Sequence, residues 1–192
     1  MVGALHQALA DHLPLRLDFY EDYLRPTRVR EGRVGAASFL AALSFLRRED
    51  AEWDPIMARA GRSAAEWVFD GLPRVQRIWF RRLPASWRLR LALRLTRELV
   101  ADSMPPSRAT VTLTRGTGVL EIEGSAFCDA REKAAAPRCR FYGAALERFG
   151  ELLDVGVRVG WDGCRAMGHP RCSLRFEVPG MERIETAREA HR

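Results

Sequence analysis

The spacing of apolar residues divides the chain into a helical half and a half rich in strands. In the first half, apolar side chains recur every three or four positions, as one face of a helix requires. This pattern predicts helices over residues 35–49, over 51–70 and over 74–102, the last interrupted near Pro84. Residues 1–33 carry no sustained period and predict short helical or irregular pieces.

Proline, glycine and serine mark the expected helix ends. Pro55 falls in the first turn of its helix, where a missing N–H costs nothing. Gly71 and Pro73 end the same helix. Ser86 is the predicted N-cap of the segment after Pro84, because its hydroxyl oxygen can accept a hydrogen bond from a first-turn N–H.

After Met-Pro-Pro-Ser at 104–107 the period changes to that of strands. Residues 109–124 alternate in polarity around an Arg-Gly-Thr-Gly turn, which is typical of a β-hairpin. An amphipathic helix is predicted over 139–153, followed by strands over 155–161 and 172–178. The order of helices, hairpin, helix and hairpin predicts an α+β fold with helices packed on one face of an antiparallel sheet.

The length of 192 residues suits one domain with an appendage. We expect an N-terminal extension at 1–34 and a single ligand-binding domain at 35–180. That domain comprises a helical half at 35–104 and a sheet half at 108–178, and a polar tail follows at 181–192. A hydrophobic content of 47% excludes a disordered chain.

The formal net charge of +6 raises the question of a nucleic-acid partner. Lys133 is the lone lysine, and the arginines are spread along the chain, so we predict no nucleic-acid partner. No apolar run approaches the roughly 20 residues of a membrane span. The first residues include Asp11 and no cationic region, so we do not expect a cleaved signal peptide. We expect a cytoplasmic protein.

All four cysteines lie in the last third of the chain, and they are Cys128, Cys139, Cys164 and Cys172. Cys164 and Cys172 flank the turn between the last two strands, while Cys139 opens a helix whose dipole favours a thiolate. Four converging thiolates suit a tetrahedral structural Zn²⁺ site. The alternative is four buried free cysteines that act as small hydrophobic residues. His169 in the same turn is either a substitute ligand or an exposed loop histidine.

The segment CRFYGAALERFGELLDVGVRVGWDGCRAMGHPRCSLRFEV resembles the signature of the 4-vinyl-reductase domain family. The motif is a cysteine that opens a helix, a strand, C-x-A-x-G-x-x-x-C and a closing strand. The match covers residues 108–178, and 35–102 fits in outline. The family includes a free-standing protein of bacteriochlorophyll synthesis and the effector-binding part of aromatic-sensing transcriptional activators. The resemblance implies a fold similar to transport-protein-particle subunits and, more distantly, to heme nitric-oxide sensors.

The resemblance also implies a role for the cysteines. In the aromatic sensors the residues that match Cys139, Cys164 and Cys172 bind a structural zinc. The fourth ligand of the sensors is a carboxylate just before the second of these cysteines, where this chain has Trp-Asp-Gly at 161–163. We expect Cys128 to be the fourth ligand, with Asp162 and His169 as alternatives.

Aromatic residues gather in the helical half, beside arginines. The expected ligand-binding residues are Trp53, Trp67, Trp79, Phe80, Arg81, Arg82 and Trp87. Such aromatic residues are either core packing or the wall of a pocket between helices and sheet, rimmed by arginines such as Arg77. A porphyrin suits both features, because its ring stacks on aromatic side chains and its propionates pair with guanidinium groups.

No dinucleotide fingerprint or Ser-His-Asp order is visible, although the family name implies a vinyl reductase. A zinc held by four thiolates has no open position for chemistry. We therefore expect an accessory protein that binds and delivers a magnesium-porphyrin in bacteriochlorophyll biosynthesis. The alternatives are a 4-vinyl reductase acting with a partner and a sensor module for another hydrophobic ligand. Expected partners are pathway enzymes such as magnesium chelatase or the methyltransferase, with a homodimer as a further alternative.

Overall fold

A computed structural model describes residues 1–25, 35–104, 106–114, 116–128 and 133–179. The helices are α1 (Val2–His12), α2 (Leu17–Leu24), α4 (Ala36–Leu46), α5 (Asp50–Asp70), α6 (Arg74–Arg82), α7 (Ala85–Ser103) and α8 (Arg140–Leu152). Short 3₁₀ turns are η1 (Pro14–Arg16), η2 (Ala126–Cys128) and η3 (Arg165–Met167). The strands are β1 (Arg108–Thr114), β2 (Thr117–Glu123), β3 (Arg158–Gly163) and β4 (Cys172–Glu177).

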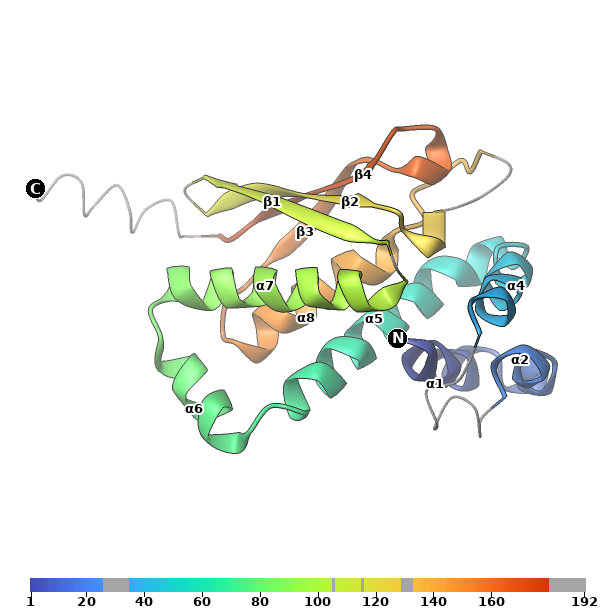
Figure 1. Cartoon of the computed structure of the whole chain (residues 1–192), viewed down its shortest axis with the longest axis horizontal. Coiled ribbons are helices and arrows are strands. Elements are labelled where there is room, and N and C mark those ends of the chain that lie inside the picture. Colours follow the sequence, from blue (N-terminus) through green and yellow to red (C-terminus); the bar gives the residue numbers. More distant parts are fainter. Residues whose placement is uncertain (26–34, 105, 115, 129–132, 180–192) are drawn as a thin grey trace, which may run out of the picture.

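The four described strands form one antiparallel sheet in the order β1-β2-β4-β3. Alternate residues of the central strands, Leu120, Ile122, Leu174 and Phe176, are fully buried. Helices α7 and α8 cover this face of the sheet, and α5 lies beyond them (Figure 1). The architecture is therefore α+β with helices on one face of an antiparallel sheet, as the sequence predicts.

Helix α5 packs closely against α8 because Gly61 has no side chain. A Cβ at this position would lie 2.1 Å from the carbonyl oxygen of Phe141 and 3.2 Å from the Cβ of Ala144. Both distances are shorter than an ordinary van der Waals contact. The glycine therefore lets the backbones of α5 and α8 approach closely. We call this contact between α5 and α8 the seam, and it lies at the centre of the helical layer.

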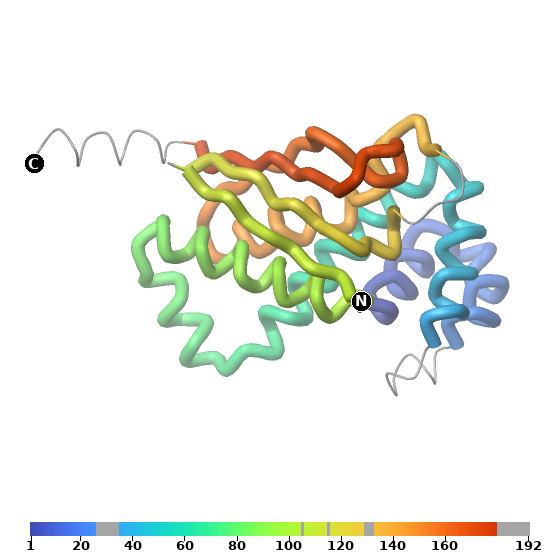
Figure 2. Tube along the Cα trace, turned by 45° about the horizontal axis from the view of Figure 1, so that its top comes forward, coloured from blue at the N-terminus to red at the C-terminus, as the bar shows by residue number. Residues whose placement is uncertain are grey.

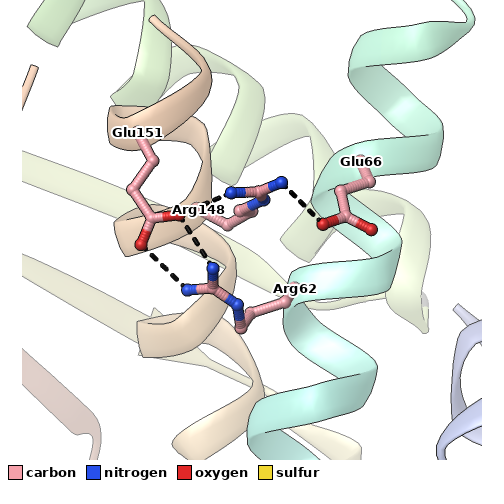
Figure 3. A network of polar contacts seen from close by, with 4 residues as sticks. All are labelled: Arg62, Glu66, Arg148 and Glu151. Atoms are coloured by element: carbon pink, nitrogen blue, oxygen red, sulfur yellow. Dashed lines mark hydrogen bonds and ion pairs between the residues drawn. The ribbon is translucent and has the colours of Figure 1, made fainter. Parts of the chain in front are cut away.

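A network of four charged residues lies along the seam between α5 and α8 (Figure 3). Arg62 donates two hydrogen bonds to the Glu151 carboxylate, at 2.9 and 2.8 Å. Arg148 bridges Glu151 at 2.6 Å and Glu66 at 2.9 Å. The Arg62 guanidinium holds the pKa of Glu151 below its ordinary value. These ion pairs join α5 to α8 on the solvent-exposed side of the contact, and apolar residues fill its buried side.

The N-terminal residues belong to the same core as the rest of the chain. Ala4, Leu5 and Leu9 of α1 are fully buried, and α1 packs against α5. Of the expected extension at 1–34, residues 26–34 lie outside the described part of the chain, as does the expected tail at 181–192. No helix in the described ranges is long and apolar enough to cross a membrane.

The N-cap prediction for α7 is wrong. The helix begins at Ala85, and Pro84 occupies the N-cap position. The Pro84 carbonyl accepts hydrogen bonds from the N–H groups of Trp87 at 2.9 Å and Arg88 at 3.1 Å. Ser86 therefore lies inside the first turn, where it cannot act as the cap.

Candidate functional site

The four cysteines meet at one point. Their Sγ atoms all lie within 4.8 Å of one another, and all four side chains are buried. Cys164 Sγ lies 3.5 Å from Cys128 Sγ and 3.9 Å from Cys172 Sγ. Cys128 ends η2, Cys139 is the N-cap of α8, and Cys172 begins β4. The cluster therefore ties the turn after the first hairpin, the start of α8 and the second hairpin together.

Backbone N–H groups point at the sulfur atoms. The Arg138 N–H donates to Cys164 Sγ at 3.3 Å, and the Arg165 N–H donates to Cys172 Sγ at 3.5 Å. Gly168 adopts φ +96° at the end of η3, which lets the chain reverse between the two cysteines. These donors would stabilise negative charge on the sulfur atoms of Cys164 and Cys172.

The thiols perturb one another's acidity. Hydrogen bonding to the other three thiols, together with burial, raises the pKa of Cys139. Hydrogen bonds from the other three thiols, reinforced by the Arg138 N–H, lower the pKa of Cys164. If all four thiols ionised at this spacing, a bound cation would be needed to neutralise the repulsion between them.

The alternative fourth ligands lie elsewhere. Asp162 accepts a hydrogen bond from Arg175 Nε at 3.1 Å on the exposed face of the sheet. His169 is exposed and is not among the residues that meet at the cluster. Within the described residues, Cys128 completes the group. Four buried sulfur ligands can hold a metal ion in a closed site, without an open coordination position.

Trp53 and two arginines brace the cluster from the helical side. The Trp53 ring is buried and lies 5.9 Å from the Arg47 guanidinium and 5.2 Å from that of Arg138. Arg47 donates to the carbonyl oxygens of Ala126 at 2.9 Å and Phe127 at 3.2 Å, both in η2. The residue that caps the end of α4 thereby holds the turn that carries the first cysteine.

The other expected aromatic residues lie far from Trp53. Trp67, on the same helix and fourteen residues later, is about 21 Å away along the axis. Trp67, Trp79 and Trp87 are 50%, 66% and 59% exposed, and Phe80 is partly buried. They belong to the adjoining ends of α5, α6 and α7 (Figure 1). The structure thus gathers three tryptophans at one end of the molecule and leaves Trp53 in the core.

The expected arginines flank the exposed tryptophans. Arg81 and Arg82 are exposed in the last turn of α6. Arg81 Nε donates to the Leu152 carbonyl at 3.1 Å, and Arg77 pairs with Asp70 at 2.6 Å. We call the exposed surface formed by Trp67, Val68, α6 and Trp87 the α6 surface.

The α6 surface and the cysteine cluster lie at opposite ends of the molecule. Both views place α6 at one end and the turn between β3 and β4 at the other (Figures 1 and 2). A ligand on the α6 surface would therefore not contact the cluster.

Comparison with known proteins supports the fold. No model of a known protein family matches the chain, and no curated protein sequence matches it either. A solved structure of trafficking protein particle complex subunit 3 from Naegleria fowleri, covalently bound to palmitic acid, has a TM-score of 0.52 at 11% identity. The match covers 74% of this chain and 92% of that one. The phenol-responsive sensory domain of the transcription activator PoxR, with phenol, has a TM-score of 0.38 at 19% identity, over 68% of this chain and 80% of that one. The likeness to the trafficking subunit shows a shared fold.

Proposed function

We propose that this protein binds a tetrapyrrole on the α6 surface and delivers it between the enzymes of bacteriochlorophyll biosynthesis. The observation that carries the proposal is the exposure of Trp67, Trp79 and Trp87 beside Arg81 and Arg82. Large aromatic side chains are usually covered in a folded chain, so a group of exposed ones marks a binding surface. The resemblance of residues 139–178 to the 4-vinyl-reductase domain family supports a tetrapyrrole as the ligand.

The chemistry of the surface suits a flat ring with acidic substituents. Indole rings stack on a porphyrin face, and a guanidinium group pairs with a propionate through two parallel hydrogen bonds. The tryptophans lie on separate helices, which allows a large ring to contact more than one of them. Magnesium-porphyrin intermediates have this combination of features.

The cysteine cluster has a structural role in this proposal. We infer that it binds one Zn²⁺, which four sulfur ligands would hold without an open position. The metal would not contact the porphyrin, since the turn between β3 and β4, which carries two of the cysteines, lies far from α6 (Figure 2). A binding protein is therefore favoured over a zinc-dependent catalyst.

A second candidate is a carrier of acyl chains. It is supported by the shared fold of the trafficking subunit, whose solved structure contains covalently bound palmitic acid. Competition between palmitate and the porphyrin separates the two candidates. A tetrapyrrole carrier should bind the porphyrin more tightly than palmitate, and its porphyrin affinity should fall when a stacking tryptophan is removed. An acyl-chain carrier should show neither property.

The test is a titration with magnesium protoporphyrin monomethyl ester, followed by absorbance and tryptophan quenching. Trp79→Ala should weaken binding by about 1–3 kcal/mol, by analogy with stacking of bases on aromatic residues. Arg82→Ala should weaken a porphyrin with two free propionates more than its dimethyl ester. Arg94→Ala is the matched control, because Arg94 is equally exposed but pairs with Glu98 on the body of α7.

Three outcomes would contradict the proposal. One is the absence of saturable binding. Another is normal binding by Trp79→Ala with loss of the spectral shift in His169→Ala, which would move the site to the turn between β3 and β4. A third is conversion of the bound porphyrin to a product two mass units heavier when NADPH is added, which would indicate a vinyl reductase instead of a carrier.

A further inference from the structure

Helix α6 is amphipathic, and its apolar side faces solvent. None of its nine residues is buried. Val75 is 68% exposed and Ile78 is 56% exposed, and both share with Trp79 one arc of about 100°, which also contains the exposed Arg82. A surface helix normally turns this side to the core. Here the apolar arc is available for contact with something outside the chain.

Two arginines tie α6 to the body of the protein. Around the helix axis Arg77 lies about 160° from Val75 and Arg81 about 120° from it, and both reach back to neighbouring helices. Arg77 pairs with Asp70 at the end of α5, and Arg81 donates to the Leu152 carbonyl at the end of α8. These contacts favour the orientation in which Val75 and Ile78 face solvent.

Neighbouring residues extend the apolar arc into a wider surface. Trp67 and Val68 at the end of α5 are exposed, as is Trp87 at the start of α7. Arg90 lies over the Trp87 ring at 5.9 Å, which places a cation beside the indole. The α6 surface therefore combines exposed apolar side chains with a rim of cations.

The charge of this region restricts what can cover it. Residues 67–90 contain six arginines and one acidic residue, Asp70, which is paired with Arg77. A second copy of the chain would bring the same positive charge to the contact, which disfavours self-association. A negatively charged partner with an apolar interior fits both features.

We propose that the α6 surface docks on an anionic lipid bilayer. Tryptophan side chains favour the headgroup region of a membrane, while Val75 and Ile78 would reach the acyl boundary. The arginines of the rim would be attracted to acidic headgroups. This binding goes beyond the proposed function, because it needs no porphyrin, although the two share the tryptophans.

The docked orientation follows from the fold. Because the cysteine cluster lies at the end opposite α6, it would face away from the bilayer (Figure 1). The porphyrin-binding tryptophans would lie at the lipid surface. A poorly soluble ring could then pass between the bilayer and the protein without crossing water.

The experiment is cosedimentation of the full chain, without porphyrin, with vesicles of phosphatidylcholine containing 30% phosphatidylglycerol or none. We expect binding only to the anionic vesicles, a blue shift of tryptophan emission, and release in 0.5 M salt. The double variant Val75→Ser/Ile78→Ser should bind at least tenfold more weakly. Leu15→Ser is its matched control, because Leu15 is 99% exposed on η1 and should not affect binding.

A charge-reversed pair tests the rim. Arg82→Glu should lose the preference for phosphatidylglycerol, and Arg94→Glu on the body of α7 should keep it. Equal binding to both kinds of vesicle, no binding at low salt, or full binding by the Val75→Ser/Ile78→Ser variant would overturn the proposal. So would a dimer of the parent protein that becomes a monomer in this variant, since the surface would then be a self-association interface.

The same variants separate this proposal from the proposed function. Val75→Ser/Ile78→Ser should weaken vesicle binding by tenfold or more but porphyrin binding in solution by less, because the stacking tryptophans remain in this variant. Trp79→Ala should weaken both activities. The vesicle experiment is run without porphyrin, and the titration is run without vesicles. Absence of vesicle binding would therefore contradict only the membrane proposal, and absence of porphyrin binding would contradict only the proposed function.

Discussion

At the scale of single residues, Gly61 is where the backbones of two helices approach each other. Any side chain there would meet the Phe141 carbonyl, and a carbonyl in a helix backbone cannot rotate away. Gly61→Ala should therefore force α5 and α8 apart and lower the free energy of unfolding by at least about 2 kcal/mol, even though alanine is the better helix former. Urea unfolding measures the change.

Gly156→Ala is the control for this prediction. Nothing lies within 4 Å of a Cβ at Gly156, so the substitution meets open space. Equal stability of Gly61→Ala and the parent protein would show that the seam between α5 and α8 is looser than the structure indicates.

The choice of the fourth cluster residue is also decided at this scale. The sequence left Cys128, Asp162 and His169 as alternatives, because 10 residues separate Cys128 from Cys139 and spacing does not show where an irregular segment leads. The strand register decides against the aspartate: Asp162 lies on the exposed face of β3, where it pairs with Arg175. Arg47 has no sequence signal that links it to Ala126 and Phe127, which precede Cys128, since they meet only through the fold.

This arrangement gives a prediction about metal content. Cys128→Ser should lower the zinc retained per chain and weaken zinc affinity by about tenfold or more, because a hydroxyl is a poor substitute for a thiolate. Asp162→Asn should retain the zinc of the parent protein. Elemental analysis of untagged protein, purified without added metal, measures both. Loss of metal in Asp162→Asn with full retention in Cys128→Ser would contradict the assignment.

At the scale of elements, the sequence predicts most helices and strands because their apolar periods are clear. Ends were harder to predict: Ser86 has the side chain of an N-cap, yet the carbonyl of Pro84 already starts the helix. The strand expected from residue 155 begins at Arg158, because the Val155 N–H bonds back to Gly150 at the end of α8. The direction in which α6 turns its apolar side could not be predicted, since α6 contacts residues distant in sequence, such as Leu152.

The ionic seam between α5 and α8 gives a prediction about acidity. The pKa of Glu151 is lowered in the folded chain, first by Arg62, so the network stabilises the fold above the ordinary pKa of glutamate. This contribution is lost as the pH falls through the lowered pKa. Glu151→Gln should cost about 0.5–1 kcal/mol near neutral pH, as expected of exposed ion pairs. The difference from the parent should shrink on acidification.

Urea unfolding over a pH series measures this effect. Glu98→Gln is the control, because Glu98 forms a single exposed pair with Arg94 within one helix. Its effect should be smaller than that of Glu151, which joins two helices. A difference between Glu151→Gln and the parent that grows as the pH falls would contradict the sign of the predicted shift.

At the scale of the whole molecule, the cysteine cluster and the α6 surface are built from different elements. The cluster joins η2, α8 and the second hairpin, so a metal bound there contributes its binding energy to folding. The α6 surface draws on α5, α6 and α7, none of which contributes a cysteine. We therefore expect stability and ligand affinity to respond separately to loss of the metal.

Removal of the proposed zinc with a strong chelator should lower the melting temperature by about 10 °C or more, because a loss of several kcal/mol shifts a chain of this size by that amount. Acidification should act in the same direction, since thiolates must take up protons as the metal leaves. Below the new melting temperature, the metal-free protein and Cys164→Ser should retain most of the affinity of the parent for porphyrin. Calorimetry and the porphyrin titration, run on the same samples, measure both quantities.

A melting temperature that does not change when the chelator is added would contradict the metal site. The cluster would then be four free thiols that pack in the core. A loss of porphyrin affinity in folded Cys164→Ser would show that the two ends of the molecule are coupled.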